Sequence, residues 1–145
     1  MRLTLIFVLF FAILVEAPRA ETRSFSGRAV VAATGAHLYT EYHRQTWRDG
    51  RLQKVFIRYV APDGSVLAER SADFSRNPLA PDFTYKNNQD GSTTKVRASN
   101  ASSFRVTVTG GENPVSGGVQ AAPAPALTGL GLDNLVSERW QNLSA

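Results

Sequence analysis

The stretch from Asp49 to Gly64 decides the fold, and it reads DGRLQKVFIRYVAPDG. It begins and ends with Asp-Gly, a pair whose residues tolerate the positive φ angles of tight hairpin turns. Between the two pairs, Val55, Ile57 and Tyr59 occupy every second position, the period of a β-strand. The stretch therefore predicts one strand that is bounded by two hairpin turns.

Similar segments lie on both sides of this strand. A third Asp-Gly pair, Asp90-Gly91, separates two of them, and Ser103–Thr109 alternates most regularly. The expected strands are residues 25–34, 38–47, 52–60, 66–74, 83–87, 93–98 and 103–109. Sequential strands with short connections pair in chain order. The sequence thus predicts a mainly β fold, an antiparallel meander of about six to seven strands forming a curled sheet or half-barrel, with one C-terminal amphipathic helix.

The meander is expected to occupy residues 21–109, after an N-terminal targeting segment. Residues 1–20 have a basic start and an apolar run, Leu5–Val15, which predict a signal peptide cleaved after Ala17 or Ala20. The apolar run is shorter than the roughly 20 residues of a membrane-spanning helix. We therefore expect the protein to be exported, and to be periplasmic or secreted after cleavage.

Two segments follow the meander. Residues 110–131 are rich in Gly, Pro and Ala and predict a linker or loop. Residues 132–145 predict a helix with Asp133 as its N-cap. Its apolar residues recur at helical spacing and form one stripe, which a helix this short must pack against the sheet to be stable. The stripe comprises Leu132, Leu135, Val136, Trp140 and Leu143.

Composition excludes several classes of protein. The 145 residues contain no cysteine, which excludes disulfide scaffolds, cysteine-based metal sites, thiol catalysis and an anchor through an acylated cysteine. The formal net charge is +4, a value typical of soluble domains, and the basic residues are spread along the chain. No nucleic-acid partner is expected, and no cofactor motif or metal-ligand spacing is present.

Two acidic constellations could support catalysis. Glu41 and His43 share one face of a strand and lie about 6.6 Å apart by strand rise, so they could reach one metal ion. Asp73 and Asp82 flank a proline-containing loop and could act as a carboxylate pair. An envelope hydrolase or metal-dependent enzyme is one alternative. The competing interpretations are a polar sheet face for the first pair and turn-stabilising aspartates for the second.

Arginine and aromatic residues are interleaved on one expected hairpin. Arg44, Arg48, Arg51 and Arg58 lie there together with Tyr42, Trp47 and Tyr59. This pattern allows a surface module that binds anionic lipid or polysaccharide, in peripheral contact with an anionic envelope surface. The competing interpretation is a solvated face on which arginine stems cover apolar side chains.

Several short motifs occur in a fixed order along the chain. They are Tyr39-x-Glu41-x-His43, Tyr59-x-x-Pro62-Asp63-Gly64, Asp73-Phe74-Ser75 with Pro78, Pro81-Asp82-Phe83, and Gly131-x-Asp133-x-x-Val136-x-x-x-Trp140-x-x-Leu143. This set resembles a family of uncharacterised exported proteins of Gram-negative bacteria. The resemblance implies export and no particular activity, cofactor or catalytic residue. Chains of that family run on past the helix into further strands, so the sequence leaves open whether this chain is a fragment.

The absence of catalytic motifs favours a binding or structural module over an enzyme. We predict an exported cell-envelope protein that can hold an apolar small molecule or lipid between the sheet and the helix. The residues expected to line such a site are Phe56, Tyr59, Phe74, Phe104, Val106 and Trp140.

Overall fold

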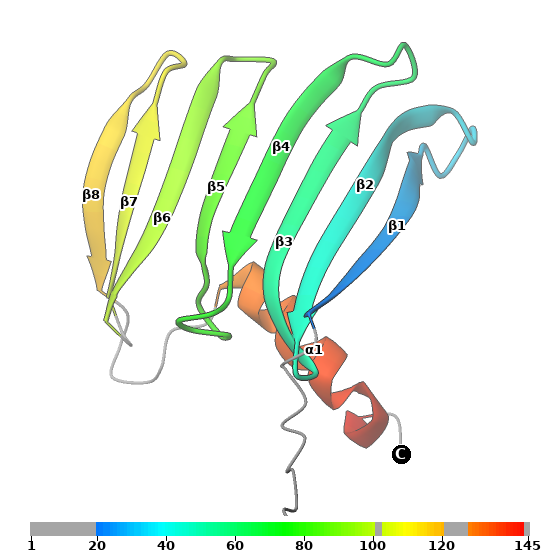
Figure 1. Ribbon diagram of the computed structural model, residues 1–145. Helices are drawn as coiled ribbons and strands as arrows, with labels where there is room; N and C mark the ends of the chain where they lie inside the picture. The colour runs from blue at the N-terminus through cyan, green and yellow to red at the C-terminus, as the bar shows by residue number, and fades with distance from the viewer. Residues whose placement is uncertain (1–19, 101–102, 121–127, 144–145) are drawn as a thin grey trace, which may run out of the picture.

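One eight-stranded sheet and one helix make up the computed structural model, which describes residues 20–100, 103–120 and 128–143 (Figure 1). The strands are β1 Ala20–Val30, β2 His37–Arg48, β3 Arg51–Val60, β4 Val66–Asp73, β5 Asp82–Asn87, β6 Ser92–Asn100, β7 Ser103–Thr109 and β8 Val115–Gln120. The helix α1 spans Gly129–Leu143. Neighbouring strands pair antiparallel in chain order, and the sheet is open. The predicted mainly β meander with a C-terminal helix is confirmed.

The Asp-Gly pairs lie in three of the hairpin connections, as predicted. Arg48 pairs with Arg51 around a two-residue turn in which Asp49 has a φ of 50° and Gly50 a φ of 71°. Positive φ at both central residues is the conformation that follows the right-handed twist of the strands. In the next turn, the Asp63 carboxylate accepts a hydrogen bond from the backbone N–H of Ser65 at 2.9 Å.

Strand boundaries differ from the expectation at both edges of the sheet. The first strand is Ala20–Val30 rather than residues 25–34, because the chain turns at Val31, whose carbonyl accepts from the N–H of Gly35. The eighth strand, Val115–Gln120, lies inside the segment predicted as a linker. It contains Gly117 and Gly118, which weaken the strand pattern in the sequence. The predicted signal peptide falls on residues 1–20, of which 1–19 lie outside the described residues.

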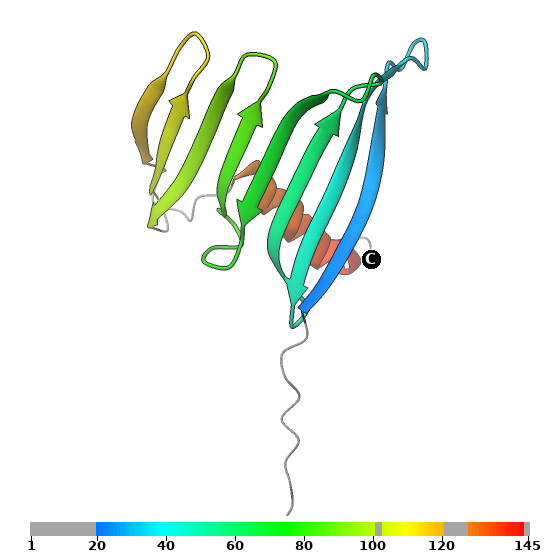
Figure 2. The same cartoon turned by 45° about the horizontal axis from the view of Figure 1, so that its top comes forward.

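The sheet has two chemically different faces, because residues directly opposite each other on paired strands share a face. One face, which we call the helix face, carries Val55, Ile57, Ala72 and Phe74 and packs against Leu130 of α1. The opposite face, which we call the basic face, carries Arg44, Phe56 and Arg58 and the residues in register with them. Figure 2 shows α1 behind the strands, on the helix face.

The core lies where α1 meets the sheet. Leu52, Val55, Ile57, Ala72 and Phe74 form one buried cluster, and Trp47, Tyr59, Phe83 and Leu130 pack around it. Both views place α1 across the lower ends of β1 to β4 (Figures 1 and 2).

The loop between β4 and β5 holds the start of the helix. The side chain of Asn77 accepts hydrogen bonds from the N–H groups of Leu79 and Ala80, both at 3.1 Å. The carbonyl of Leu79 in turn accepts from the N–H of Thr128 at 3.1 Å. Gly131 is buried against Leu79, because a Cβ atom at this position would overlap the Leu79 carbonyl group. The loop predicted from its two prolines is thus the anchor of α1.

The predicted start of the helix is wrong, and so is the predicted burial of Leu132. The helix begins at Gly129, and Thr128 rather than Asp133 is its cap, because the Thr128 hydroxyl accepts from the N–H of Gly131 at 3.1 Å. Leu132 of the predicted stripe is 47% exposed, and Asn134 is 3% exposed instead. The close approach of Gly131 to Leu79 thus sets which side of the first helical turns is buried. The side chains of Trp140 and Leu143 lie outside the described residues. Within the described chain, no helix has the length and apolarity needed to cross a membrane.

Candidate functional site

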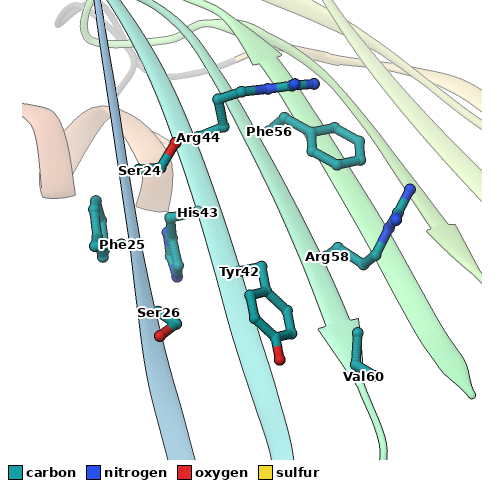
Figure 3. Close-up of a pocket in the computed structure, with 9 residues that line it drawn as sticks. All are labelled: Ser24, Phe25, Ser26, Tyr42, His43, Arg44, Phe56, Arg58 and Val60. Carbon is teal, nitrogen blue, oxygen red and sulfur yellow. The ribbon is translucent and has the colours of Figure 1, made fainter. Parts of the chain in front are cut away.

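A hollow of about 690 Å³ lies over β1, β2 and β3 and is drawn in Figure 3. On the basic face it is lined by Tyr42, Arg44, Phe56 and Arg58. The guanidinium carbons of Arg44 and Arg58 each lie 5.7 Å from the centre of the Phe56 ring, so two cations flank one aromatic ring. Tyr42 is 52% exposed beside them. This arrangement presents positive charge next to an exposed ring, as the sequence pattern indicated, although with Phe56 in place of Trp47 and Tyr59.

Strand alternation concentrates charge on this side of the sheet. The register places ten basic residues on the basic face: Arg28, Arg44, Arg48, Arg51, Lys54, Arg58, Lys86, Lys95, Arg97 and Arg105. Its acidic residues are Glu69, Asp73 and Asp82. The net positive charge of this face is therefore larger than the formal net charge of the whole chain, which is +4. Such a surface attracts polyanions over a range of about one Debye length.

Glu41 and His43 meet on the helix face. The imidazole Nε2 of His43 lies 2.8 Å from Oε2 of Glu41, and the His43 ring stacks on Phe25 with 4.5 Å between ring centres. The structure therefore brings this predicted pair together. The other histidine of the chain, His37, lies within hydrogen-bond distance of the Thr40 hydroxyl. Within residues 20–100, 103–120 and 128–143, no three His, Asp or Glu side chains are placed to hold one metal ion.

Asp73 and Asp82 are direct partners across β4 and β5. The Ser75 side chain and backbone N–H both donate to Asp73, and the Ser75 hydroxyl is the main reason that the pKa of Asp73 lies below its usual value. Asp82 accepts from the N–H of Ala98 at 2.8 Å and lies 3.6 Å from Arg76. A carboxylic acid that protonates a leaving group needs a raised pKa. The arrangement of Asp73 therefore favours the turn-stabilising interpretation.

The predicted lining residues of the apolar site divide between the two faces. Phe56 lies on the basic face, opposite Arg44 and Ser71, so it cannot contact a ligand on the helix face. Tyr59, Phe74, Phe104 and Val106 all lie on the helix face, but they do not form one pocket. The Trp140 side chain lies outside the described residues.

On the helix face, Phe74 and Tyr59 belong to different hollows. Phe74 is 3% exposed and, with Leu52 and Leu130, lines a hollow of about 240 Å³ beside α1. Tyr59 lines a second hollow of about 550 Å³ together with Tyr39. Their rings meet edge to face, with 5.8 Å between ring centres.

An apolar row crosses the helix face from β3 to β7. It consists of Val55, Ala72, Phe83, Val96 and Val106, each the direct partner of the next. The first members lie in the core under α1, whereas Val106 is half-buried on the part of the sheet that α1 does not cross. The apolar surface thus continues from the core toward the last strands.

Sequence reasoning missed the polar group at the centre of this face. Arg70 and Tyr85 are partners across β4 and β5, with the Arg70 guanidinium carbon 5.4 Å from the centre of the Tyr85 ring. Both line the hollow that contains Tyr59. The available signal was their spacing, because Arg70 and Tyr85 each lie two residues from a member of the apolar row, Ala72 or Phe83, and residues two apart on a strand share a face.

No family model, curated protein or solved structure matches this chain.

Proposed function

We propose that the protein is a non-enzymatic binding module of the cell envelope that holds an apolar molecule, such as a lipid, against the helix face. One observation carries this proposal. The apolar row on the helix face extends beyond the part of the sheet that α1 crosses, and Val106 and Val108 remain half-buried there. Apolar surface of this kind is stabilised by about 25 cal/mol for each Å² that a ligand removes from water.

Export is the second part of the proposal. It rests on the basic start and the apolar run of residues 1–20, and on the resemblance of the ordered motifs to exported proteins. Fractionation of cells that express the full chain should place the protein outside the cytoplasm. Retention of the full-length protein in the cytoplasm would contradict this part.

The test of binding uses a neutral apolar fluorophore, N-phenyl-1-naphthylamine. We expect its fluorescence to rise on addition of the protein and to fall when an unlabelled lipid competes. Val106→Asp should weaken probe binding at least tenfold, because it places a charge in the apolar row. Thr107→Asp is the matched control, since the adjacent residue of β7 points to the basic face, opposite Lys95.

A second substitution keeps this test informative if Val106→Asp prevents folding. This substitution is Val115→Asp. Val115 is 61% exposed and pairs with Val108 on the helix face. The fold should therefore tolerate an aspartate at this position, and the aspartate places a charge on the same surface. Urea unfolding of each variant establishes that it is folded. A wild-type protein that binds no probe, or equal binding by the helix-face and basic-face variants, would overturn the proposal.

The basic face supports a second candidate function, the binding of an anionic lipid surface. The observation that favours it is the pair of arginines around the half-buried ring of Phe56, beside the exposed ring of Tyr42. Arg44→Gln with Arg58→Gln should reduce binding to phosphatidylglycerol vesicles, and salt should weaken wild-type binding. Each single variant, Arg44→Gln and Arg58→Gln, is compared with Arg23→Gln, which removes one positive charge from the helix face, where Arg23 lies over Trp47. A loss in Arg23→Gln equal to the loss in either single variant would contradict this function.

A further inference from the structure

The hollow of about 550 Å³ on the helix face has an unusual lining for an apolar surface. Three tyrosines, Tyr39, Tyr59 and Tyr85, surround Arg70 there. All four side chains come from neighbouring strands, β2 to β5, so the sheet itself fixes their spacing. Each is half-buried, which lowers the local dielectric constant without closing the hollow to a ligand.

Arg70 is a cation without a protein counterion in this hollow. Its Nε is buried and has no hydrogen-bond partner in the described part of the chain. A buried donor without a partner is destabilising, and structures seldom keep one unless water, an ion or a ligand satisfies it. The side chain is held over the Tyr85 ring and lies beside Ile57, its direct partner on β3.

The acidic side chain in the lining of this hollow already has a partner within the protein. Glu41 lines the same hollow, but its carboxylate lies 2.8 Å from His43 Nε2. No ion pair joins Arg70 to a carboxylate among the residues that the structure describes. The positive charge of Arg70 is therefore available to an anion that enters the hollow.

The tyrosines supply hydrogen-bond donors of the matching kind. Burial raises the pKa of the Tyr59 hydroxyl, and the charge of Arg70 partly opposes the rise. The hydroxyl therefore stays protonated in neutral solution and can donate. Arg and Tyr together recognise an anionic group by charge-assisted hydrogen bonds, which are stronger than those between neutral groups.

Apolar surface begins directly next to this polar group. Ala72 follows Arg70 by two residues on β4, and Phe83 precedes Tyr85 by two on β5, so both lie on the same face one step along the strands. They belong to the apolar row that ends at Val106. A ligand with an anionic end at Arg70 would thus extend an apolar chain toward Phe83 and Val106, the members of the row that are half-buried rather than buried.

We propose that the hollow around Arg70 binds the carboxylate end of a fatty acid, whose acyl chain lies on the helix face over Phe83 and Val106, the half-buried members of the apolar row. This inference rests on the proposed function and adds the ligand class. A neutral lipid of equal length would gain the apolar contacts but would leave Arg70 without a partner.

The experiment compares two ligands that differ only at the head group, dodecanoate and dodecanol. Each displaces N-phenyl-1-naphthylamine from the full-length protein at pH 8 and low salt. Wild-type protein should bind dodecanoate roughly 10- to 100-fold more tightly than dodecanol, the range of a charge-assisted hydrogen bond. Arg70→Met should remove this preference while dodecanol binding stays the same, because methionine keeps the apolar stem.

Two further variants complete the test. Arg58→Met removes an arginine from the basic face of the neighbouring strand and should keep the full preference. Tyr85→Phe keeps the ring and removes only a hydroxyl, and should reduce the preference severalfold even if Arg70→Met fails to fold. Equal binding of the two ligands by wild-type protein, or a preference that survives in Tyr85→Phe and in any folded Arg70→Met, overturns the inference. If neither ligand binds, the proposed function fails as well.

Discussion

Replacing Gly131 by alanine tests how α1 is held on the sheet. A Cβ atom at this position would overlap the carbonyl oxygen and carbon of Leu79 and lie 2.9 Å from its Cα, closer than real Cβ contacts come. All three atoms belong to the backbone, so no side-chain rotation relieves the overlap. The start of the helix must therefore move away from the loop.

The sign of the stability change separates two views of the helix. In a helix that makes no tertiary contact, Gly→Ala stabilises by about 1 kcal/mol. In the docked helix, displacement disturbs the packing of Leu130 and the hydrogen bond from Thr128 N–H to the Leu79 carbonyl. Overpacking of this kind costs about 1–3 kcal/mol. Because the overlapped atoms belong to the backbone, the upper end of this range, about 3 kcal/mol, applies. The gain of about 1 kcal/mol in helix propensity then leaves a net loss of about 2 kcal/mol for Gly131→Ala.

Urea unfolding followed by circular dichroism measures this difference. With a slope of about 2 kcal/mol/M, the expected loss lowers the unfolding midpoint by roughly 1 M. Gly129→Ala is the matched control, because a Cβ atom there meets nothing within 4 Å, and its midpoint should be unchanged or slightly higher. A Gly131→Ala protein as stable as wild type, or more stable, would refute the docking described above.

Three further predictions concern stability. Phe74→Ala should lower the free energy of unfolding by about 3–5 kcal/mol, because the ring is 3% exposed, whereas Phe25→Ala at 52% exposure should have a much smaller effect in the same urea titration. Thr128→Ala removes the helix cap and should lower the free energy of unfolding by about 1 kcal/mol in the same urea titration. The Ser75 hydroxyl lowers the pKa of Asp73 in the folded protein. The Asp73 carboxylate therefore contributes its full stabilisation above the pKa of the unfolded chain, about 3.9, and this contribution is lost as the pH falls through the lower pKa of the folded protein. The difference in urea-unfolding midpoint between Asp73→Asn and wild-type protein should therefore become smaller below pH 4. A difference that stays constant from pH 7 to 2 would contradict this prediction.

The local signals in the sequence were sufficient for most of the sheet. Asp49-Gly50 gave a two-residue turn with both φ angles positive, and the strands on either side pair as expected. These features depend on the conformational preferences of a few adjacent residues. For that reason chain-order pairing could be predicted without any knowledge of tertiary contacts.

The helix could not be placed from its own pattern. Periodicity favoured a stripe that includes Leu132, yet this residue is 47% exposed and Asn134 is buried. The deciding contact is between Gly131 and the backbone of Leu79, about 50 residues apart in the chain. A glycine in a helix carries no signal of the neighbour that requires it.

The candidate site was predicted by residue type rather than by face. Phe56 and Tyr59 are both aromatic, so residue type alone favours one shared site, although a strand places residues three apart on opposite faces. Arg70 gives no signal of its role in the sequence, because an arginine is usually solvent-exposed. Its buried Nε becomes apparent only when the neighbouring strands are in register.

The two proposed binding surfaces are separated by a single sheet, and this makes them independently testable. Arg58 and Arg70 lie on β3 and β4, but one projects from the basic face and the other from the helix face. Arg58 is paired with Glu69 at 2.9 Å, so its charge is partly neutralised within the protein. Arg70 has no such partner among the described residues. An anion that enters the helix face therefore meets a cation with no carboxylate to displace, whereas a polyanion at the basic face must compete with Glu69. For this reason, loss of Arg70 should alter the choice of ligand head group, and loss of Arg58 should alter only the attraction to anionic surfaces.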